Sequence, residues 1–239
     1  MLISITIFYN ILLYMDFLES KDMKVKLINT SFYITYVFLL TTGTITFIEA
    51  IRTKIPEIRN ILNLETCISI IAAYFYGKFL EKLDKDKVDY KEINETRYTD
   101  WAITTPIMLL VLVLALLYNS KGGRLNFFTF LLILFLNYGM LIFGYLGEQK
   151  ILDRNQANII GFVFFFALYY FIYRTFLHKN YNFDNIILYV AFLVLWAMYG
   201  VFYFYDEVTK NVGYNVLDLF SKCFVGIFFW AYYTKVFVL

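Results

Sequence analysis

The chain of 239 residues has little of what metalloenzymes and disulfide-bonded domains require: one histidine, two cysteines and two prolines. Cys67 and Cys223 lie in different apolar segments without the spacing of zinc ligands, so we expect both to be small core residues. His178 alone cannot build a His-rich metal site, and it argues against a histidine-based catalytic triad. The sequence also lacks the basic patch of a nucleic-acid binder. We therefore expect neither an enzyme nor a nucleic-acid-binding protein.

Charged residues are scarce as well, at 17% of the chain, whereas 61% of the residues are apolar and 22% are aromatic. This composition is typical of a polytopic membrane protein rather than of a soluble core with a polar surface. Several apolar runs reach the length of about 20 residues that crosses a bilayer as a helix. We predict an all-α, integral, multi-pass membrane protein.

Seven membrane-length segments can be placed along the chain, joined by short connections that make sequential helices antiparallel neighbours. Their expected bounds are 29–51, 57–83, 94–118, 125–146, 158–176, 185–205 and 213–237. The stretch 1–27 has no positive charge before its apolar part and is interpreted as an extracellular segment that lies at the membrane interface. Residues 28–239 are then expected to form one seven-helix bundle.

The charges of the connections predict how the bundle is oriented in the membrane. Basic residues dominate the connections after the first, third and fifth segments; they include Arg52, Arg59, Arg124 and Arg174. The connections on the other side mix acidic and basic residues, as in the stretch 81–97. The positive-inside rule therefore places the N-terminus outside and the C-terminus in the cytoplasm.

The last segment contains two ionisable residues, Asp218 and Lys222, inside an otherwise apolar run. Their spacing of four residues puts both on one helix face. An ionisable residue within a membrane span suggests a functional site. A buried lysine that loses its proton is a nucleophile toward carbonyl groups, so one interpretation is an attachment point for an aldehyde. The other is an ion pair that stabilises helix packing.

A second polar face is predicted in the third segment, where Arg97, Asp100 and Thr104 follow one another at helical spacing. A span with these residues must turn them toward a polar interior or toward partners. Arg97 and Lys222 supply two positive charges, and Asp100 and Asp218 supply two negative ones. Buried ions are tolerated when they are balanced in this way.

Three motifs, in the right order, resemble the microbial (type 1) rhodopsin family. The run from Arg97 to Pro106 is similar to the signature of that family's third helix. The run Trp196–Tyr199 resembles its Trp-x-x-Tyr motif, and Asp218 with Lys222 matches its Asp-x-x-x-Lys motif. The likeness covers residues 28–237 and is greatest to the viral rhodopsins of large algal viruses.

The resemblance implies a photoreceptor in which Lys222 binds all-trans retinal as a Schiff base. It implies that Asp100 is the counterion and first proton acceptor and that Asp218 is the second counterion. It further implies that Thr104 hydrogen-bonds Asp100 and that Arg97 orients water on the extracellular side. The other residues implied to line the retinal pocket are Trp101, Thr105, Met108, Met140, Gly144, Trp196, Tyr199 and Tyr203.

Two positions depart from the family pattern. Gly200 stands where proline usually follows the tyrosine of the sixth helix, so a kink there would need another cause. Val111 lies eleven residues after Asp100, where efficient proton pumps carry a carboxylate that reprotonates the Schiff base. Val111 cannot supply that proton.

Glu65 is a further acid well inside a span, and the predicted orientation places it in the cytoplasmic half. Together with nearby polar residues it resembles the ion path of channel-forming rhodopsins more than that of pumps. An equally weighted alternative is a structural carboxylate that reaches the headgroups or a neighbouring helix. In a channel, the expected partners of a constriction between Glu65 and the retinal site are Ser31, Thr35 and Asn215.

Val111 and Glu65 favour a light-gated cation channel as the first functional hypothesis. The alternative is an outward proton pump, which the intact set of Arg97, Asp100 and Asp218 favours. A third hypothesis is a photosensor that signals to a partner protein. The expected partners are the lipid bilayer and monovalent cations or protons, and the sequence is compatible with a homo-oligomer.

Overall fold

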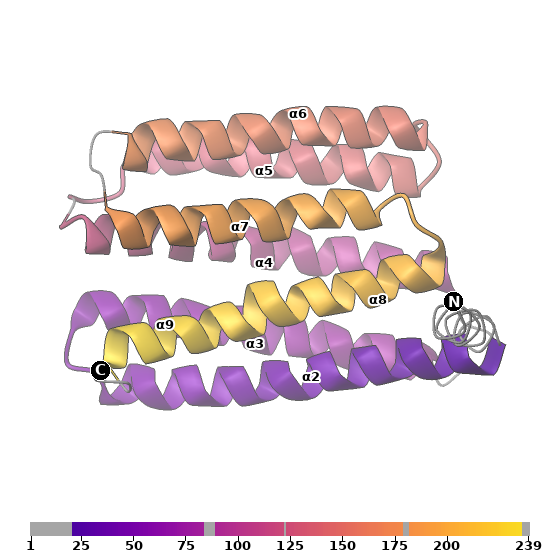
Figure 1. The fold of residues 1–239 in the computed structure, drawn as a ribbon, viewed down its shortest axis with the longest axis horizontal. Coiled ribbons are helices and arrows are strands. Elements are labelled where there is room, and N and C mark those ends of the chain that lie inside the picture. Colours follow the sequence, from indigo (N-terminus) through magenta and orange to yellow (C-terminus); the bar gives the residue numbers. More distant parts are fainter. Residues whose placement is uncertain (1–20, 84–88, 122, 179–181, 236–239) are drawn as a thin grey trace, which may run out of the picture.

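The computed structural model describes residues 21–83, 89–121, 123–178 and 182–235, which form seven antiparallel helical rods (Figure 1). The first four rods are α2 (Lys21–Arg52), α3 (Pro56–Leu83), α4 (Tyr90–Asn119) and α5 (Phe127–Glu148). The fifth is α6 (Arg154–Ile172) with the π-helical segment η1 (Tyr173–Leu177), and the sixth is α7 (Phe183–Phe202). The seventh consists of α8 (Glu207–Asp218), the π-helical segment η2 (Leu219–Phe224) and α9 (Val225–Thr234).

The first rod begins earlier than the sequence predicts. α2 starts at Lys21 instead of near residue 29, so the expected boundary between residues 27 and 28 falls inside a helix. Residues 1–20, which make up the rest of the expected interfacial segment, lie outside the described residues.

Short polar side chains set the start of the later rods. Each accepts hydrogen bonds from backbone N–H groups of the first turn, which have no partner within the helix. The capping residues are Asp89 for α4, Asn126 for α5, Asp153 for α6, Asn182 for α7 and Asp206 for α8. Because of these caps, α4 and α6 begin about one turn before their predicted starts.

The rods close into a ring around a shared interior. Each packs beside the next along the chain, and α2 also packs against α8 and α9. Below, the end where α4 and α8 begin is called the α8 end, and the end where α9 finishes is called the α9 end. They lie on the right and on the left of Figure 1.

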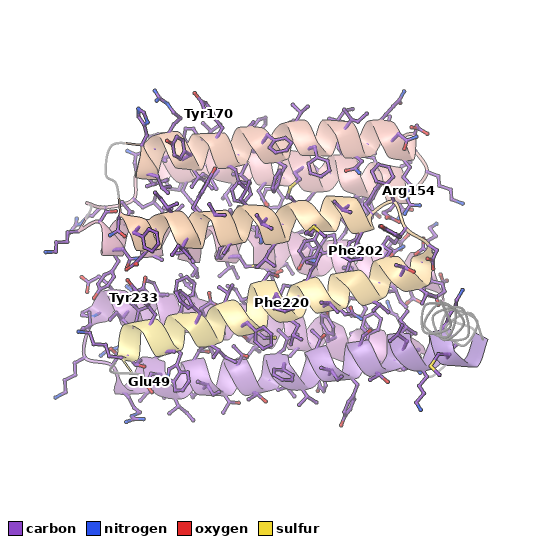
Figure 2. The ribbon with its side chains drawn as sticks, viewed as in Figure 1. Glu49, Arg154, Tyr170, Phe202, Phe220 and Tyr233 are labelled. Carbon is purple, nitrogen blue, oxygen red and sulfur yellow. The ribbon has the colours of Figure 1, made fainter. Side chains whose placement is uncertain are left out.

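Six helical stretches among the described residues are long and apolar enough to cross a membrane: α2, α4, α5, α6 with η1, α7, and α8 to α9. α3 has 28 residues, but Asn60, Asn63 and Glu65 interrupt its apolar sequence. The most apolar part of α4 is 56% buried, compared with 17% for α5. α4 therefore belongs to the interior, whereas α5 and α6 expose large side chains such as Phe128 and Tyr170. Tyr170 points outward from α6 (Figure 2).

The interior of the described part of the chain contains three apolar clusters. The first, on the α9 side, includes Ile61, Leu112 and Phe229, and the second, on the α8 side, includes Phe32 and Phe79. The third, smaller cluster includes Trp101 and Tyr214. Cys223 is buried in the second cluster, as predicted. Cys67, in contrast, is exposed on α3, so its prediction as a core residue is wrong.

Candidate functional site

The centre of the site is Lys222, which lies in the π-helical segment η2. Its Nζ is 2.7 Å from Asp100 Oδ2 and 3.4 Å from Asp218 Oδ2. All three side chains are at most 1% exposed. The ammonium nitrogen stands for the nitrogen that would bond to an aldehyde carbon. π-Helical turns are rare and frequently occur at functional sites.

The two carboxylates are held in different ways. Asp218 accepts hydrogen bonds from the hydroxyls of Tyr76, at 2.8 Å, and Tyr199, at 2.6 Å, and it lies 3.6 Å from Arg97 Nη1. Asp100 bonds to Lys222 through Oδ2, and its Oδ1 has no hydrogen-bond partner among the described residues. Asp218 is therefore surrounded by donors, whereas Asp100 has an oxygen free to accept a proton.

Thr104 hydrogen-bonds Asp100, as predicted, but through the backbone of Asp100 and not through its carboxylate. Thr104 Oγ1 donates to the backbone carbonyl of Asp100, at 2.9 Å. A threonine in a helix readily bonds the carbonyl four residues earlier, and Thr105 does the same with Trp101. Thr105 also accepts a hydrogen bond from Asn137 Nδ2, at 2.9 Å, which ties α4 to α5.

Arg97 closes the α8 side of the ionic centre. Its side chain is 1% exposed, and Nη2 donates to Asn211 Oδ1 at 3.2 Å and to Asn215 Oδ1 at 2.8 Å. Four rings lie within 6 Å of its guanidinium carbon: Phe32, Tyr76, Phe79 and Tyr214. These cation–π contacts hold the charge of Arg97 in an aromatic cage.

The three expected constriction partners meet at this same level, where Ser31 and Thr35 both contact Asn215. Asn215 Nδ2 donates to Ser31 Oγ at 2.9 Å, and Thr35 Oγ1 donates to the backbone carbonyl of Asn215 at 3.2 Å. Asn215 precedes Lys222 by about two helical turns toward the α8 end. They therefore lie beside Arg97 and not between Lys222 and Glu65, and this part of the prediction is wrong.

Glu65 lies on the opposite side of Lys222, where its side chain is 2% exposed. Its Oε2 is 3.2 Å from the position that a Cβ would take on Gly226, one turn after Lys222. No hydrogen bond or ion pair holds this carboxyl within the part of the chain that the structure describes. Ser69, one turn along α3, also has a buried hydroxyl without a partner there.

A cavity opens beside Lys222, between α4, α5, α6 and α7. The cavity volume open to the centres of water-sized molecules is about 110 Å³. On the same measure one water molecule needs roughly 10–15 Å³, so the cavity is much larger than a single water site. Its wall includes every residue implied to bind retinal: Lys222, Trp101, Thr105, Met108, Met140, Gly144, Trp196, Tyr199 and Tyr203. A mostly aromatic and apolar wall with one buried amine fits an apolar aldehyde. Asp100 Oδ1, which has no hydrogen-bond partner among the described residues, can accept a proton beside that amine.

Several wall residues were not predicted, because no motif marks them. α6 contributes Ala157, Asn158, Gly161, Phe162 and Phe165. Small residues at 157 and 161, one turn apart, were the only available signal. Gly200 has a clear reason to lack a side chain, since a Cβ there would lie 2.5 Å from Phe162 Cζ. Glycine in place of proline thus admits the Phe162 ring to the cavity wall.

The family described as bacteriorhodopsin-like protein matches residues 26–236. The green-light absorbing proteorhodopsin of Gamma-proteobacterium EBAC31A08 is 26% identical over 225 residues, which cover 84% of each chain. The crystal structure of viral rhodopsin OLPVRII is 55% identical, covers 89% of this chain and 100% of its own, and superposes with a TM-score of 0.83. The structure of xanthorhodopsin, a light-driven ion pump with dual chromophore, shares the fold at 18% identity and a TM-score of 0.70, covering 87% of this chain and 92% of its own.

Proposed function

Because the chain belongs to the bacteriorhodopsin-like family, we propose that it is a microbial rhodopsin that moves protons outward in response to light. Microbial rhodopsins are integral, multi-pass membrane photoreceptors that bind retinal through a Schiff base to a lysine, and they are not enzymes.

We assign the retinal attachment to Lys222. Its amine is buried and contributes to the wall of the cavity. Lys210 is also fully buried, but its ammonium bonds two carboxylates and it is not part of that wall. Bound retinal supplies the absorption of visible light and an isomerisation that reorients the nitrogen it shares with Lys222.

Asp100 is the proposed proton acceptor. It is the carboxylate nearest to Lys222 Nζ, and its Oδ1 is open. A proton on Asp218 would have to displace one of the hydroxyls of Tyr76 or Tyr199 or weaken the pairing with Arg97. Asp218 is therefore suited to remain a fixed negative charge that keeps Arg97 and Lys222 in place.

Glu65 is the proposed internal proton donor, and its setting is the observation that carries the proposal. A carboxyl that is buried without a hydrogen bond or an ion pair in the described structure is best accommodated in its neutral, protonated form. Glu65 also lies on the side of Lys222 opposite to Arg97, beside Gly226. It could therefore return a proton to the site from the α9 end, which Val111 cannot do.

The direction follows from the predicted orientation. The basic connections with Arg52, Arg59 and Arg124 lie at the α9 end, which the positive-inside rule assigns to the cytoplasm. Release toward the α8 end and uptake from the α9 end then give net outward transport.

The test is Glu65→Gln, which keeps the shape of the side chain but removes its proton. Flash-induced absorption changes should show proton return slowed by about a hundredfold, the lower range of what a positioned acid contributes. The slowed step should also depend on pH, because its protons must now come from bulk water. Glu49→Gln is the matched control, since Glu49 pairs with exposed Arg52 near the α9 end. An unchanged rate in Glu65→Gln would refute the donor role.

A light-gated cation channel, the first hypothesis from the sequence, is the second candidate. It is supported by a buried polar stripe on α3 that contains Glu65, Thr66 and Ser69. The apolar cluster with Ile61, Leu112 and Phe229 on the α9 side would have to become hydrated for cations to pass. Photocurrents under voltage clamp separate the two, since a channel current reverses its sign with voltage and a pump current keeps one direction.

A further inference from the structure

A second buried charge cluster lies at the α8 end, apart from the retinal cavity. Lys210 is fully buried, and its Nζ lies 2.9 Å from both carboxylate oxygens of Glu148 and 3.0 Å from Glu207 Oε1. Asn94 Nδ2 donates to Glu148 at 3.2 Å and to Glu207 at 3.0 Å. These four residues, called the Lys210 cluster below, join α4, α5 and α8.

The Lys210 cluster lies on the way from the ionic centre to the solvent. Arg97 donates to Asn211 Oδ1 at 3.2 Å, and Asn211 Nδ2 donates to the backbone carbonyl of Glu207 at 2.9 Å. The Glu207 side chain is itself 40% exposed. Hydrogen bonds thus connect Arg97 through Asn211 to the backbone of Glu207, a residue of the cluster whose side chain reaches the surface.

The cluster resembles a metal-cation site in which the Lys210 ammonium group takes the place of the metal ion. An ammonium group has three N–H donors, and here the three available contacts are all carboxylate oxygens. Two carboxylates at one place attract hard cations, which prefer oxygen ligands. Arg154, at the start of α6 beside the end of α7 (Figure 2), lies 4.0 Å from Glu148 and adds positive charge. The two negative charges are therefore balanced without a free ion.

We propose that Lys210 determines ion selectivity at the α8 end by occupying the position of a free cation between Glu148 and Glu207. Metal cations would meet a fixed positive charge there, whereas protons can pass along hydrogen bonds. The proposal rests on the proposed function, proton transport. It explains how the α8 end, where protons are released, distinguishes protons from sodium ions. It predicts that removal of the ammonium creates a site that a metal cation fills.

The test is Lys210→Met, which keeps the length of the side chain and removes its charge. The thermal midpoint for loss of the visible absorption is measured on retinal-bound protein in sodium chloride and in N-methylglucamine chloride at equal ionic strength. The variant should be more stable in sodium than in the bulky organic cation, by an amount that rises with sodium concentration. The wild type should have the same midpoint in both salts.

Two further variants control for a structural role. Lys78→Met removes a lysine that is paired with Glu81 at the same end but is 42% exposed, and it should show no dependence on sodium. Lys210→Met combined with Glu207→Gln removes one charge of each sign, so its midpoint should also be the same in both salts.

The outcomes separate clearly. If Lys210→Met loses the same stability in both salts, Lys210 is only a structural ion-pair residue and the proposal is overturned. If neither Lys210 variant binds retinal in either salt, the ammonium itself is required and the proposal is overturned as well. A midpoint that rises only in sodium supports it. The thermal midpoint does not depend on proton transport. The Lys210 experiment can therefore fail while the Glu65 experiment succeeds, and the Glu65 experiment can fail while the Lys210 experiment succeeds.

Discussion

Gly226 provides the space that Glu65 occupies, since a Cβ on Gly226 would lie 3.2 Å from Glu65 Oε2 and 2.8 Å from Thr42 Cγ2. The second distance is too short for a side chain to fit without movement of a neighbour. Gly226 is one turn after Lys222, so the same glycine brings Glu65 close to the level of the reacting nitrogen. The position of Glu65, the proposed proton donor, therefore depends on the absence of a side chain at Gly226.

Gly226→Ala should displace Glu65 and slow the return of the proton by about tenfold to a hundredfold, the usual cost of a misplaced catalytic group. The absorption maximum should stay close to that of the wild type, because the charges around Lys222 are unchanged. Flash spectroscopy measures the rate, and a static spectrum measures the maximum. Gly77→Ala is the control, since its nearest neighbour would be 3.8 Å away. Equal rates in Gly226→Ala and Gly77→Ala would contradict this account of Glu65.

Lys222→Ala should abolish the visible colour that wild-type protein acquires with all-trans retinal. The variant loses the amine in the wall of the cavity. Absorption spectra before and after addition of hydroxylamine check this result. Visible absorption that resisted hydroxylamine in Lys222→Ala would place the attachment elsewhere.

Asp100→Asn should shift the absorption maximum further to the red than Asp218→Asn does. Asp100 is the nearer negative charge, at 2.7 Å from Lys222 Nζ compared with 3.4 Å for Asp218. Its loss leaves the positive charge at this nitrogen less compensated. Spectra of the two variants at one pH decide the matter, and a larger shift in Asp218→Asn would reverse the two roles.

Asp206→Ala should reduce stability at neutral pH by about 1 kcal/mol, as expected for a lost N-cap. Burial raises the pKa of Asp206, but hydrogen bonds from Thr209 and from the Val208 N–H lower it more, so the net pKa lies below its usual value of 3.8. The cap therefore stabilises the fold fully above pH 3.8 and loses this effect as the pH falls through the lowered pKa. Thermal midpoints of wild type and variant should thus converge in acid. A constant difference would show that the capping carboxylate does not titrate in this way.

The sequence predicted much of the ionic centre because its members follow local rules. Asp218 and Lys222 are four residues apart on one helix, and Arg97 and Asp100 are three apart, so helical geometry alone puts each pair on one face. The neutral balance of their charges then indicated that the two helices face each other. The structure places all four side chains in one buried group.

The Lys210 cluster could not be predicted in this way. Asn94, Glu148 and Lys210 come from three rods and are brought together only by the closure of the ring. Lys210 also follows acidic residues near a helix start, where a lysine would usually be exposed to solvent. For Thr104 the partner residue, Asp100, was predicted but the acceptor atom was not. A hydroxyl in a helix can bond either a side chain or its own backbone, and spacing does not decide which.

The π-helical segment η2 divides the seventh rod at Lys222. A π-helical turn has its hydrogen bonds between residues five apart instead of four, so the residues of α9 are out of register with those of α8. A straight α-helix would transmit a displacement at Lys222 equally in both directions. Here the wide turn can shorten or move along the chain, and α9, with Gly226 beside Glu65, can rotate while α8 stays fixed by Asp218 and Asn215. We therefore expect a displacement at Lys222 to move the α9 half of the rod more than the α8 half.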